Sequence, residues 1–328
     1  MQNWKTALKT LDGAYADATM RAYQADIQAY VAWCEDTQNT PFPTTTSQVC
    51  AFLEDEARDK APSTVRRRLY AIRKIHSLLR LPDPTQDEAI NLTLRRMRKR
   101  KLARPQQARG LTAQDLERLL DVQPATCWGL RNAAMLSLGY ELMTRRSELV
   151  ALRDEDLSLR EDGTLRVLIR RSKADQEGQG RVAFTSSRTA QRVQAWQDWR
   201  GDATNWLFCP IYQDHPIDRP LNNAMVKTII KTSAKRAGYS VADVRAFSGH
   251  SLRVGAAQNL LKRGFDTVAI MRAGGWKSTS VLARYVELAE HNVWVRIPRA
   301  FGHPFHEDLA TYSMNTWPPV PRDLATLG

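Results

Sequence analysis

The sequence predicts a mainly α-helical protein of two domains, in which the second domain contains a small antiparallel β-sheet. Its 328 residues exceed the usual size of one domain, and 43% hydrophobic with 25% charged residues is typical of a globular chain. Most segments repeat their apolar residues every three or four positions, as helices do. Within residues 164–185, apolar and polar residues instead alternate, as they do in β-strands.

The first domain, residues 1–102, is predicted to consist of helices with short connections. Asp17 is suited to cap a first long helix, a second covers residues 45–60, and a fourth ends in the basic run 95–101. The third begins at Pro62 and has two sides, because its apolar residues fall opposite its cations on a helical wheel. The apolar side comprises Val65, Leu69, Ile72, His76 and Leu79, and the basic side comprises Arg66, Arg67, Arg73 and Lys74.

Residues 103–110 are polar and interrupted by proline and glycine, which indicates a linker between the domains. The second domain, residues 111–328, is predicted to start with a helix capped by Thr112. Its further expected elements are a buried helix over 130–141, strands over 164–169 and 181–185 joined by the turn 173–180, and helices over 187–199, 221–237 and from 250 onward.

The distribution of charge predicts a polyanionic partner. The net charge is +13, and residues 62–109 alone carry 14 basic and 3 acidic side chains, a local excess of +11. Cations concentrated in this way bind nucleic acid by displacing the counterions that its phosphates hold. A solvated, arginine-rich helix surface is the simpler alternative, and we favour nucleic acid.

Several classes of protein are disfavoured by the sequence. We expect no membrane span, because no run of about 18 apolar residues occurs, and no secretory signal at the N-terminus. The four cysteines lie far apart, without metal-ligand spacing, which suits the cytoplasm. The acidic cluster 154–156 could hold Mg²⁺ in a nuclease, but such clusters more often cap a loop.

A scattered series of polar residues carries the chemical signal. It consists of the pair Arg145-x-x-Glu148, Lys173 in the predicted turn, the box His250-x-x-Arg253, and then Trp276 and Tyr285. Each is ordinary alone. Taken in order and with their spacing, they resemble the catalytic residues of the tyrosine site-specific recombinase (phage integrase) family. The resemblance covers almost the whole chain and is strongest over residues 250–257 and 270–276.

The resemblance implies cleavage of a phosphodiester by a tyrosine. Tyr285 would attack a DNA phosphate and form a 3′-phosphotyrosyl link. A phenol, with its free pKa near 10, has to lose its proton in the attack, and the pentavalent transition state needs cations at its nonbridging oxygens. By the same resemblance, Arg145 and Arg253 clamp that phosphate with bidentate guanidinium groups.

The remaining members of the series are implied to assist this step. Lys173 would be the general acid for the leaving 5′-hydroxyl, His250 would assist proton transfer, and Trp276 would pack and donate a hydrogen bond at the phosphate. Glu148 would orient the basic groups without touching DNA. The phosphotyrosyl bond conserves the energy of the broken bond, so no ATP is expected. The set of cations does the work of a metal, so neither a metal nor another cofactor is expected.

The resemblance also implies an assembly. Residues 1–102 would form a SAM-like core-binding domain that clamps double-stranded DNA together with the catalytic domain, as a dimer on each inverted-repeat site and a homotetramer on two sites. The apolar C-terminal tail, which includes residues 293–295 and Trp317, is expected to dock on a neighbouring protomer, or else to pack on its own domain. We expect a nucleoid-associated protein encoded by a bacterium, phage or plasmid. The candidate DNA contacts are Arg66, Arg67, Arg73, Lys74, Arg96, Arg98, Lys99, Asn223 and Lys227.

The leading hypothesis is therefore a recombinase that exchanges strands between two DNA sites through a Holliday junction. A type IB topoisomerase-like strand transferase would use the same nucleophile without pairing two sites. A catalytically silent, sequence-specific DNA-binding protein is the alternative from another class. A metal-dependent nuclease is the most distant one.

Overall fold

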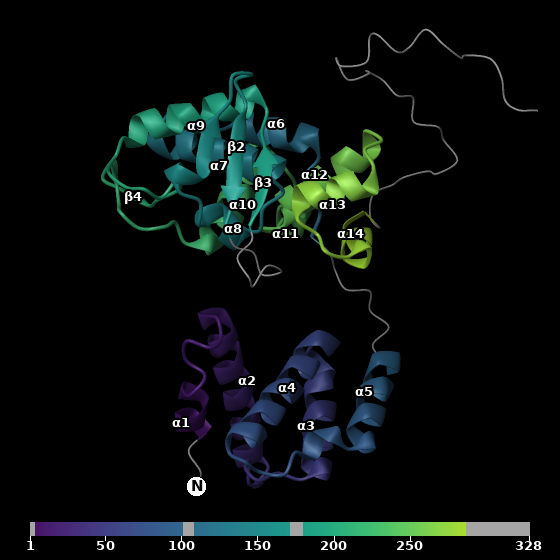
Figure 1. The fold of residues 1–328 in the computed structure, drawn as a ribbon. Coiled ribbons are helices and arrows are strands. Elements are labelled where there is room, and N and C mark those ends of the chain that lie inside the picture. Colours follow the sequence, from purple (N-terminus) through teal and green to yellow (C-terminus); the bar gives the residue numbers. More distant parts are fainter. Residues whose placement is uncertain (1–3, 101–107, 171–179, 287–328) are drawn as a thin grey trace, which may run out of the picture. The chain divides into compact units, whose positions relative to one another are not determined.

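The computed structural model describes residues 4–100, 108–170 and 180–286, and the chain divides into two compact units, Met1–Pro105 and Gln106–Gly328. The predicted mainly α-helical class is confirmed. In the described residues the β-structure is limited to short antiparallel strands (Figure 1). Lys173, most of the predicted linker and the C-terminal tail lie outside the described residues.

The first unit is a bundle of helices around its own apolar core, in which Ile27, Phe52 and Ile72 are fully buried. Its helices are α1 (Trp4–Lys9), α2 (Asp17–Asp36), α3 (Thr46–Asp59), α4 (Pro62–Leu78) and α5 (Glu88–Arg100), with a short 3₁₀ turn, Pro84–Gln86, before α5. The cap predicted at Asp17 is wrong. Ala16 occupies the cap position. The Asp17 carboxylate lies in the first turn of α2, where its negative charge interacts favourably with the positive end of the helix dipole.

The second unit combines helices with a three-stranded antiparallel sheet of order β1-β2-β3. The predicted hairpin is present as β2 and β3, with Val167 opposite Ala183, whereas β1, the pair β4–β5 and α11 were not predicted. Its elements are α6 (Ala113–Asp121), α7 (Cys127–Glu141), α8 (Arg146–Val150), β1 (Leu157–Leu159), β2 (Leu165–Ile169), β3 (Arg181–Phe184), α9 (Ser187–Arg200), β4 (Ile211–Tyr212), β5 (His215–Pro216), α10 (Asn223–Arg236), α11 (Val241–Ala246), α12 (Ser251–Lys262), α13 (Thr267–Gly274) and α14 (Thr279–Val286).

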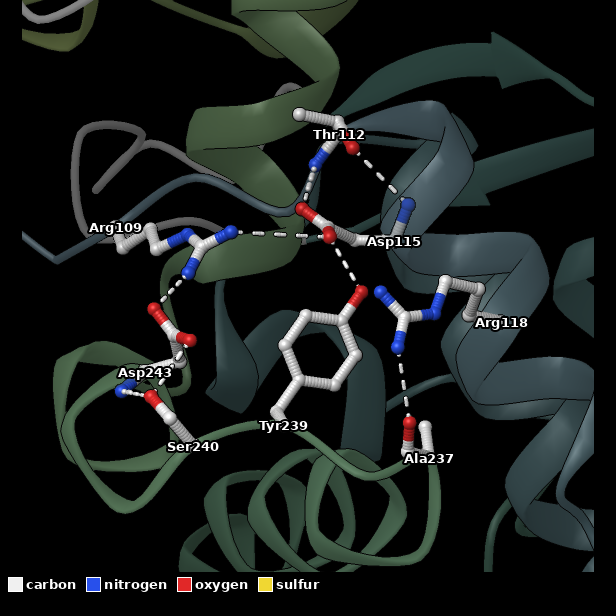
Figure 2. A network of polar contacts seen from close by, with 8 residues as sticks. All are labelled: Arg109, Thr112, Asp115, Arg118, Ala237, Tyr239, Ser240 and Asp243. Carbon is white, nitrogen blue, oxygen red and sulfur yellow. Dashed lines mark hydrogen bonds and ion pairs between the residues drawn. The ribbon is translucent and has the colours of Figure 1, made fainter.

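The chain enters the second unit through contacts with the segment that leads into α12. The Arg109 backbone N–H donates to the Ala246 carbonyl at 3.2 Å, and its guanidinium pairs with Asp243 (Figure 2). The Leu111 N–H then donates to the Ser251 carbonyl at 2.9 Å. Residues 109 and 110, which the sequence assigns to the linker, are thus packed on the second unit beside the N-terminus of α12.

The start of α6 belongs to the same polar network. Thr112 and Asp115 form a capping box, as the cap predicted at Thr112 requires, and Asp115 also accepts a hydrogen bond from the Tyr239 hydroxyl at 2.5 Å. The Arg118 guanidinium lies 4.2 Å from the centre of the Tyr239 ring and donates to the Ala237 carbonyl (Figure 2). This network joins α6 to the end of α10.

The acidic cluster at residues 154–156 has a structural role. Asp156 accepts from the Arg153 N–H and pairs with Arg170, and Asp154 pairs with Arg200 at 2.5 Å. Among the residues described, no cluster of metal-ligating side chains occurs. The helices of the described segments are also too short or too polar to cross a membrane.

Candidate active site

The pair Arg145 and Glu148 lies at the start of α8. Arg145 occupies the N-cap position, and its backbone N–H and guanidinium both donate to the Glu148 carboxylate, at 3.0 and 2.6 Å. The Glu148 side chain is 2% exposed and that of Arg145 is 23% exposed. The buried carboxylate therefore holds the arginine in place while part of the Arg145 side chain stays exposed.

Arg253 is the most buried cation of the site, with no exposed surface. Its guanidinium donates to the Met143 carbonyl and lies 4.0 Å from the centre of the Trp276 ring. Met143 has a φ of +48°, a left-handed conformation that costs a residue with a side chain about 1–2 kcal/mol. Burial, followed by the neighbouring charge of Arg145, lowers the pKa of Arg253, which nevertheless keeps its charge at neutral pH.

Trp276 links the buried arginine to the predicted nucleophile. The rings of Trp276 and Tyr285 are 5.6 Å apart and inclined at 56°. On α14, the Tyr285 carbonyl accepts a hydrogen bond from Gln258 of α12 at 2.9 Å. Packing of α12 on both α13 and α14 thus places the phenol beside Arg253.

His250 occupies the N-cap position of α12, at the edge of the same site. Its backbone N–H donates to the Ser248 hydroxyl at 3.0 Å, which fixes the turn before the helix. Partial burial lowers the pKa of His250, and the neighbouring Arg146, Arg253 and Arg145 lower it further. The imidazole is therefore neutral at pH 7 and able to accept a proton.

Arg181 is a further cation of the site, and the sequence reasoning missed it. It is the first residue of β3, directly after the hairpin turn, and its side chain donates to the carbonyls of Leu142 and Ala273. Burial lowers the pKa of Arg181 to about 10, with opposing contributions from Glu148 and Arg145. The only sequence signal was an arginine at the start of a predicted strand.

Three guanidinium groups, those of Arg145, Arg181 and Arg253, thus lie around one carboxylate, Glu148. Within the described part of the chain, Nε and Nη2 of Arg253 and the Trp276 indole N–H are buried without a hydrogen-bond partner. A local charge of +2, together with these unpaired donors, favours an anion with several oxygens, such as a phosphate.

The candidate DNA-contact residues fall into two groups. Arg67 pairs with Asp26, Arg73 bonds to Thr85, and Lys74 lies over the Tyr15 ring. The other candidates are exposed, and they are Arg66, Arg96, Arg98 and Lys99 in the first unit and Asn223 and Lys227 on α10. The Arg67 side chain is also 53% exposed despite its ion pair. The contacts of all nine candidates with DNA stay a prediction.

Comparison with known proteins follows the same division of the chain. The model of the phage integrase family matches residues 109–292, and that of the phage integrase N-terminal SAM-like domain matches residues 2–81. Recombinase cre of Escherichia phage P1 is 26% identical over 291 residues, which cover 83% of this chain and 84% of that protein. An integrase/recombinase xerD homolog of Selenomonas ruminantium is 29% identical over 292 residues, covering 86% and 84%.

Solved structures share the fold at low identity. A lambda integrase dimer bound to a COC′ core site aligns with a TM-score of 0.60 and 16% identity, over 90% of this chain and 78% of that one. XerH recombinase in a post-cleavage complex with palindromic difH aligns with a TM-score of 0.60 and 15% identity, over 83% and 76%. The resemblance stated from the motif series and the SAM-like first domain are both confirmed.

Proposed function

Because the chain belongs to the phage integrase family of tyrosine recombinases, we propose that it cuts and rejoins double-stranded DNA at specific sites with Tyr285 as nucleophile. The observation that carries this proposal is the position of the Tyr285 ring, next to Trp276 and to the buried Arg253. A phenol beside a cluster of cations with little internal counter-charge is suited to attack a phosphate.

The mechanism assigns one task to each group. Arg145 and Arg253 bind the nonbridging oxygens of the scissile phosphate, and the Trp276 indole donates to the same group. Neutral His250 accepts the proton that leaves Tyr285 in the attack. Lys173 protonates the departing 5′-oxygen, and Glu148 keeps Arg145 in position.

We further propose a Cre-like assembly, supported by the similarity of residues 250–257 and 270–276 to the cre recombinase. The domain 1–102 and the catalytic domain 111–328 form a clamp around the DNA, and the linker that joins them crosses it. Dimers on inverted-repeat sites pair into a tetramer and exchange strands through a Holliday junction. The C-terminal tail joins neighbouring protomers, and the protein acts at the nucleoid in the cytoplasm.

The test is covalent capture. The pure protein is incubated, with EDTA and without ATP, with nicked duplexes that carry random inverted repeats, and adducts that resist SDS are recovered for peptide mapping. We expect attachment at Tyr285, no adduct with Tyr285→Phe, and a normal adduct with Tyr212→Phe, which alters an exposed tyrosine of the β4–β5 pair.

Other outcomes separate the alternatives. Selective DNA binding without an adduct would identify a silent DNA-binding protein. An adduct without Holliday junctions when two sites are supplied would favour the topoisomerase-like strand transferase. An adduct on a residue other than Tyr285 would overturn the assignment of the nucleophile.

A further inference from the structure

The side chain of Arg181 connects two separate segments of the site. Its Nη2 donates to the Leu142 carbonyl at 2.7 Å, and its Nη1 donates to the Ala273 carbonyl at 2.5 Å. Leu142 lies three residues before Arg145, and Ala273 lies three residues before Trp276. One guanidinium therefore spans the chain segments that lead into two members of the catalytic series.

Both acceptors lie at the C-terminal ends of helices. Leu142 is the C-cap of α7, and Ala273 lies in the last turn of α13. The last carbonyls of a helix have no hydrogen-bond partner within the helix and lie at the negative end of its dipole. A cation that donates to them therefore supplies both a hydrogen bond and a favourable charge. Arg181 does this for two helices at once.

The geometry of these contacts requires a guanidinium. Its planar fork presents two terminal nitrogens in fixed directions, whereas the ammonium of lysine is a single point on a flexible stem. The stem of Arg181 is also confined, because a Cβ at Gly275 would lie 2.7 Å from its Cδ. A lysine at this position would keep the positive charge but could not span the two carbonyls in the same way.

We propose that Arg181 is a positioning residue, which sets the separation of the segments carrying Arg145 and Trp276 so that both meet the same phosphate. This inference rests on the proposed function. Each terminal nitrogen of Arg181 donates one N–H to a backbone carbonyl, so the guanidinium is fixed to both segments. A displacement of about 1 Å in such a site lowers a rate by about 10²-fold.

The test compares Arg181→Lys with the wild type and with Arg166→Lys, a matched change of an exposed arginine on the adjacent strand β2. Single-turnover adduct formation is measured at saturating DNA, together with DNA affinity and the thermal unfolding midpoint. We expect Arg181→Lys to form the adduct about 10²-fold more slowly with unchanged DNA affinity. Arg166→Lys should match the wild type.

A second substrate excludes a role at the leaving group. In a duplex with sulfur in place of the scissile 5′-oxygen, the departing thiolate is stable without a proton because thiols have pKa values near 8.5. We expect the loss in Arg181→Lys to persist there. A loss that disappears with sulfur would show action on the leaving group and overturn the inference.

Equal rates for Arg181→Lys and the wild type would also overturn it, because charge alone would then suffice. If Arg181→Lys does not fold, Arg181→Gln carries the test, because a single amide nitrogen cannot replace the two terminal nitrogens that reach the Leu142 and Ala273 carbonyls. A wild-type rate in that variant would contradict the proposal. The wild-type adduct at Tyr285 is the reference, so a failure of the proposed function appears in the wild type and a failure of this inference appears in the variants.

Discussion

Arg67 in the first unit and Arg253 in the second unit are held in opposite ways. In the first unit, Arg67 binds the Asp26 carboxylate through two hydrogen bonds of 2.6 and 2.8 Å, and Arg68 pairs with Glu56. In the second unit, Arg253 is more deeply buried but donates to a backbone carbonyl and lies against an indole ring. The acceptors of Arg67 and Arg68 are anionic, whereas the acceptor of Arg253 is neutral.

This difference separates structural cations from cations that remain available to a ligand. A carboxylate neutralises its arginine, so the pair stabilises the fold and adds little to the attraction of DNA. Carbonyls and an indole orient a guanidinium without neutralising it, so the charge still attracts an anion. Glu148 is the one carboxylate shared by the three clustered arginines of the second unit, within the described residues.

The largest effect is expected for Arg253→Lys. The ammonium keeps the charge but loses the fork that reaches both the Met143 carbonyl and a phosphate, so single-turnover cleavage should fall about 10²–10³-fold. DNA affinity should change little, because the contact strengthens in the transition state. Arg263→Lys, at the exposed end of the same helix, is the control, and an equal loss in both variants would contradict a specific role.

A structural arginine should behave in the reverse way. Arg67→Met removes the two hydrogen bonds that Arg67 donates to the Asp26 carboxylate, which is 1% exposed and keeps an ion pair with Arg68 at 3.7 Å. The free energy of unfolding in urea should fall by about 1–3 kcal/mol, the cost of an unsatisfied buried acceptor. DNA affinity, measured where the variant is folded, tests the separate prediction that Arg67 contacts DNA: a lower affinity supports the contact, and an unchanged affinity limits Arg67 to a role in the fold. Unchanged stability would show that the pair is energetically unimportant.

The neighbouring Arg66 provides a matched contrast. It is exposed on α4 and was predicted to contact DNA. Arg66→Met should leave stability unchanged while weakening DNA binding, and the slope of log affinity against log salt should decrease in magnitude by about 1 for one lost phosphate contact. A wild-type salt dependence would remove Arg66 from the DNA-binding surface.

The smallest effect concerns pH. The pKa of His250 lies below the ordinary 6.5, so the imidazole stays neutral until the pH falls through that lowered value. If neutral His250 accepts the phenol proton, cleavage should decline only below pH 6.5. Arg146→Gln removes a neighbouring positive charge, which should raise the pKa of His250 and move the decline to higher pH. Rates measured between about pH 5 and 8 test this, with exposed Arg245→Gln as the control.

Local features of the fold could be predicted from the sequence. Thr112 caps α6 through contacts within three residues, and the alternation of Leu165, Val167 and Ile169 identifies a strand with one buried face. The order and spacing of the motif series also placed Arg253, Trp276 and Tyr285, which the structure brings together. Such signals are contained in short stretches of sequence.

The roles of Arg67 and Arg181 could not be predicted in this way. Asp26 is 41 positions before Arg67, and the wheel that placed this arginine on a basic face does not show its partner. The carbonyls bound by Arg181 lie 39 and 92 positions away. Every residue has a backbone carbonyl, so the composition and spacing of the sequence cannot show which carbonyls accept hydrogen bonds from a distant arginine.

The most direct test of the account is the structure of Tyr285→Phe bound to its selected DNA site. The account predicts that the scissile phosphate lies between the guanidinium groups of Arg145 and Arg253, with the Trp276 indole donating to it. It also predicts that Arg181 still bridges the Leu142 and Ala273 carbonyls. A scissile phosphate held elsewhere, with Arg253 remote from it, would contradict the central claim that Arg145 and Arg253 form the catalytic phosphate site.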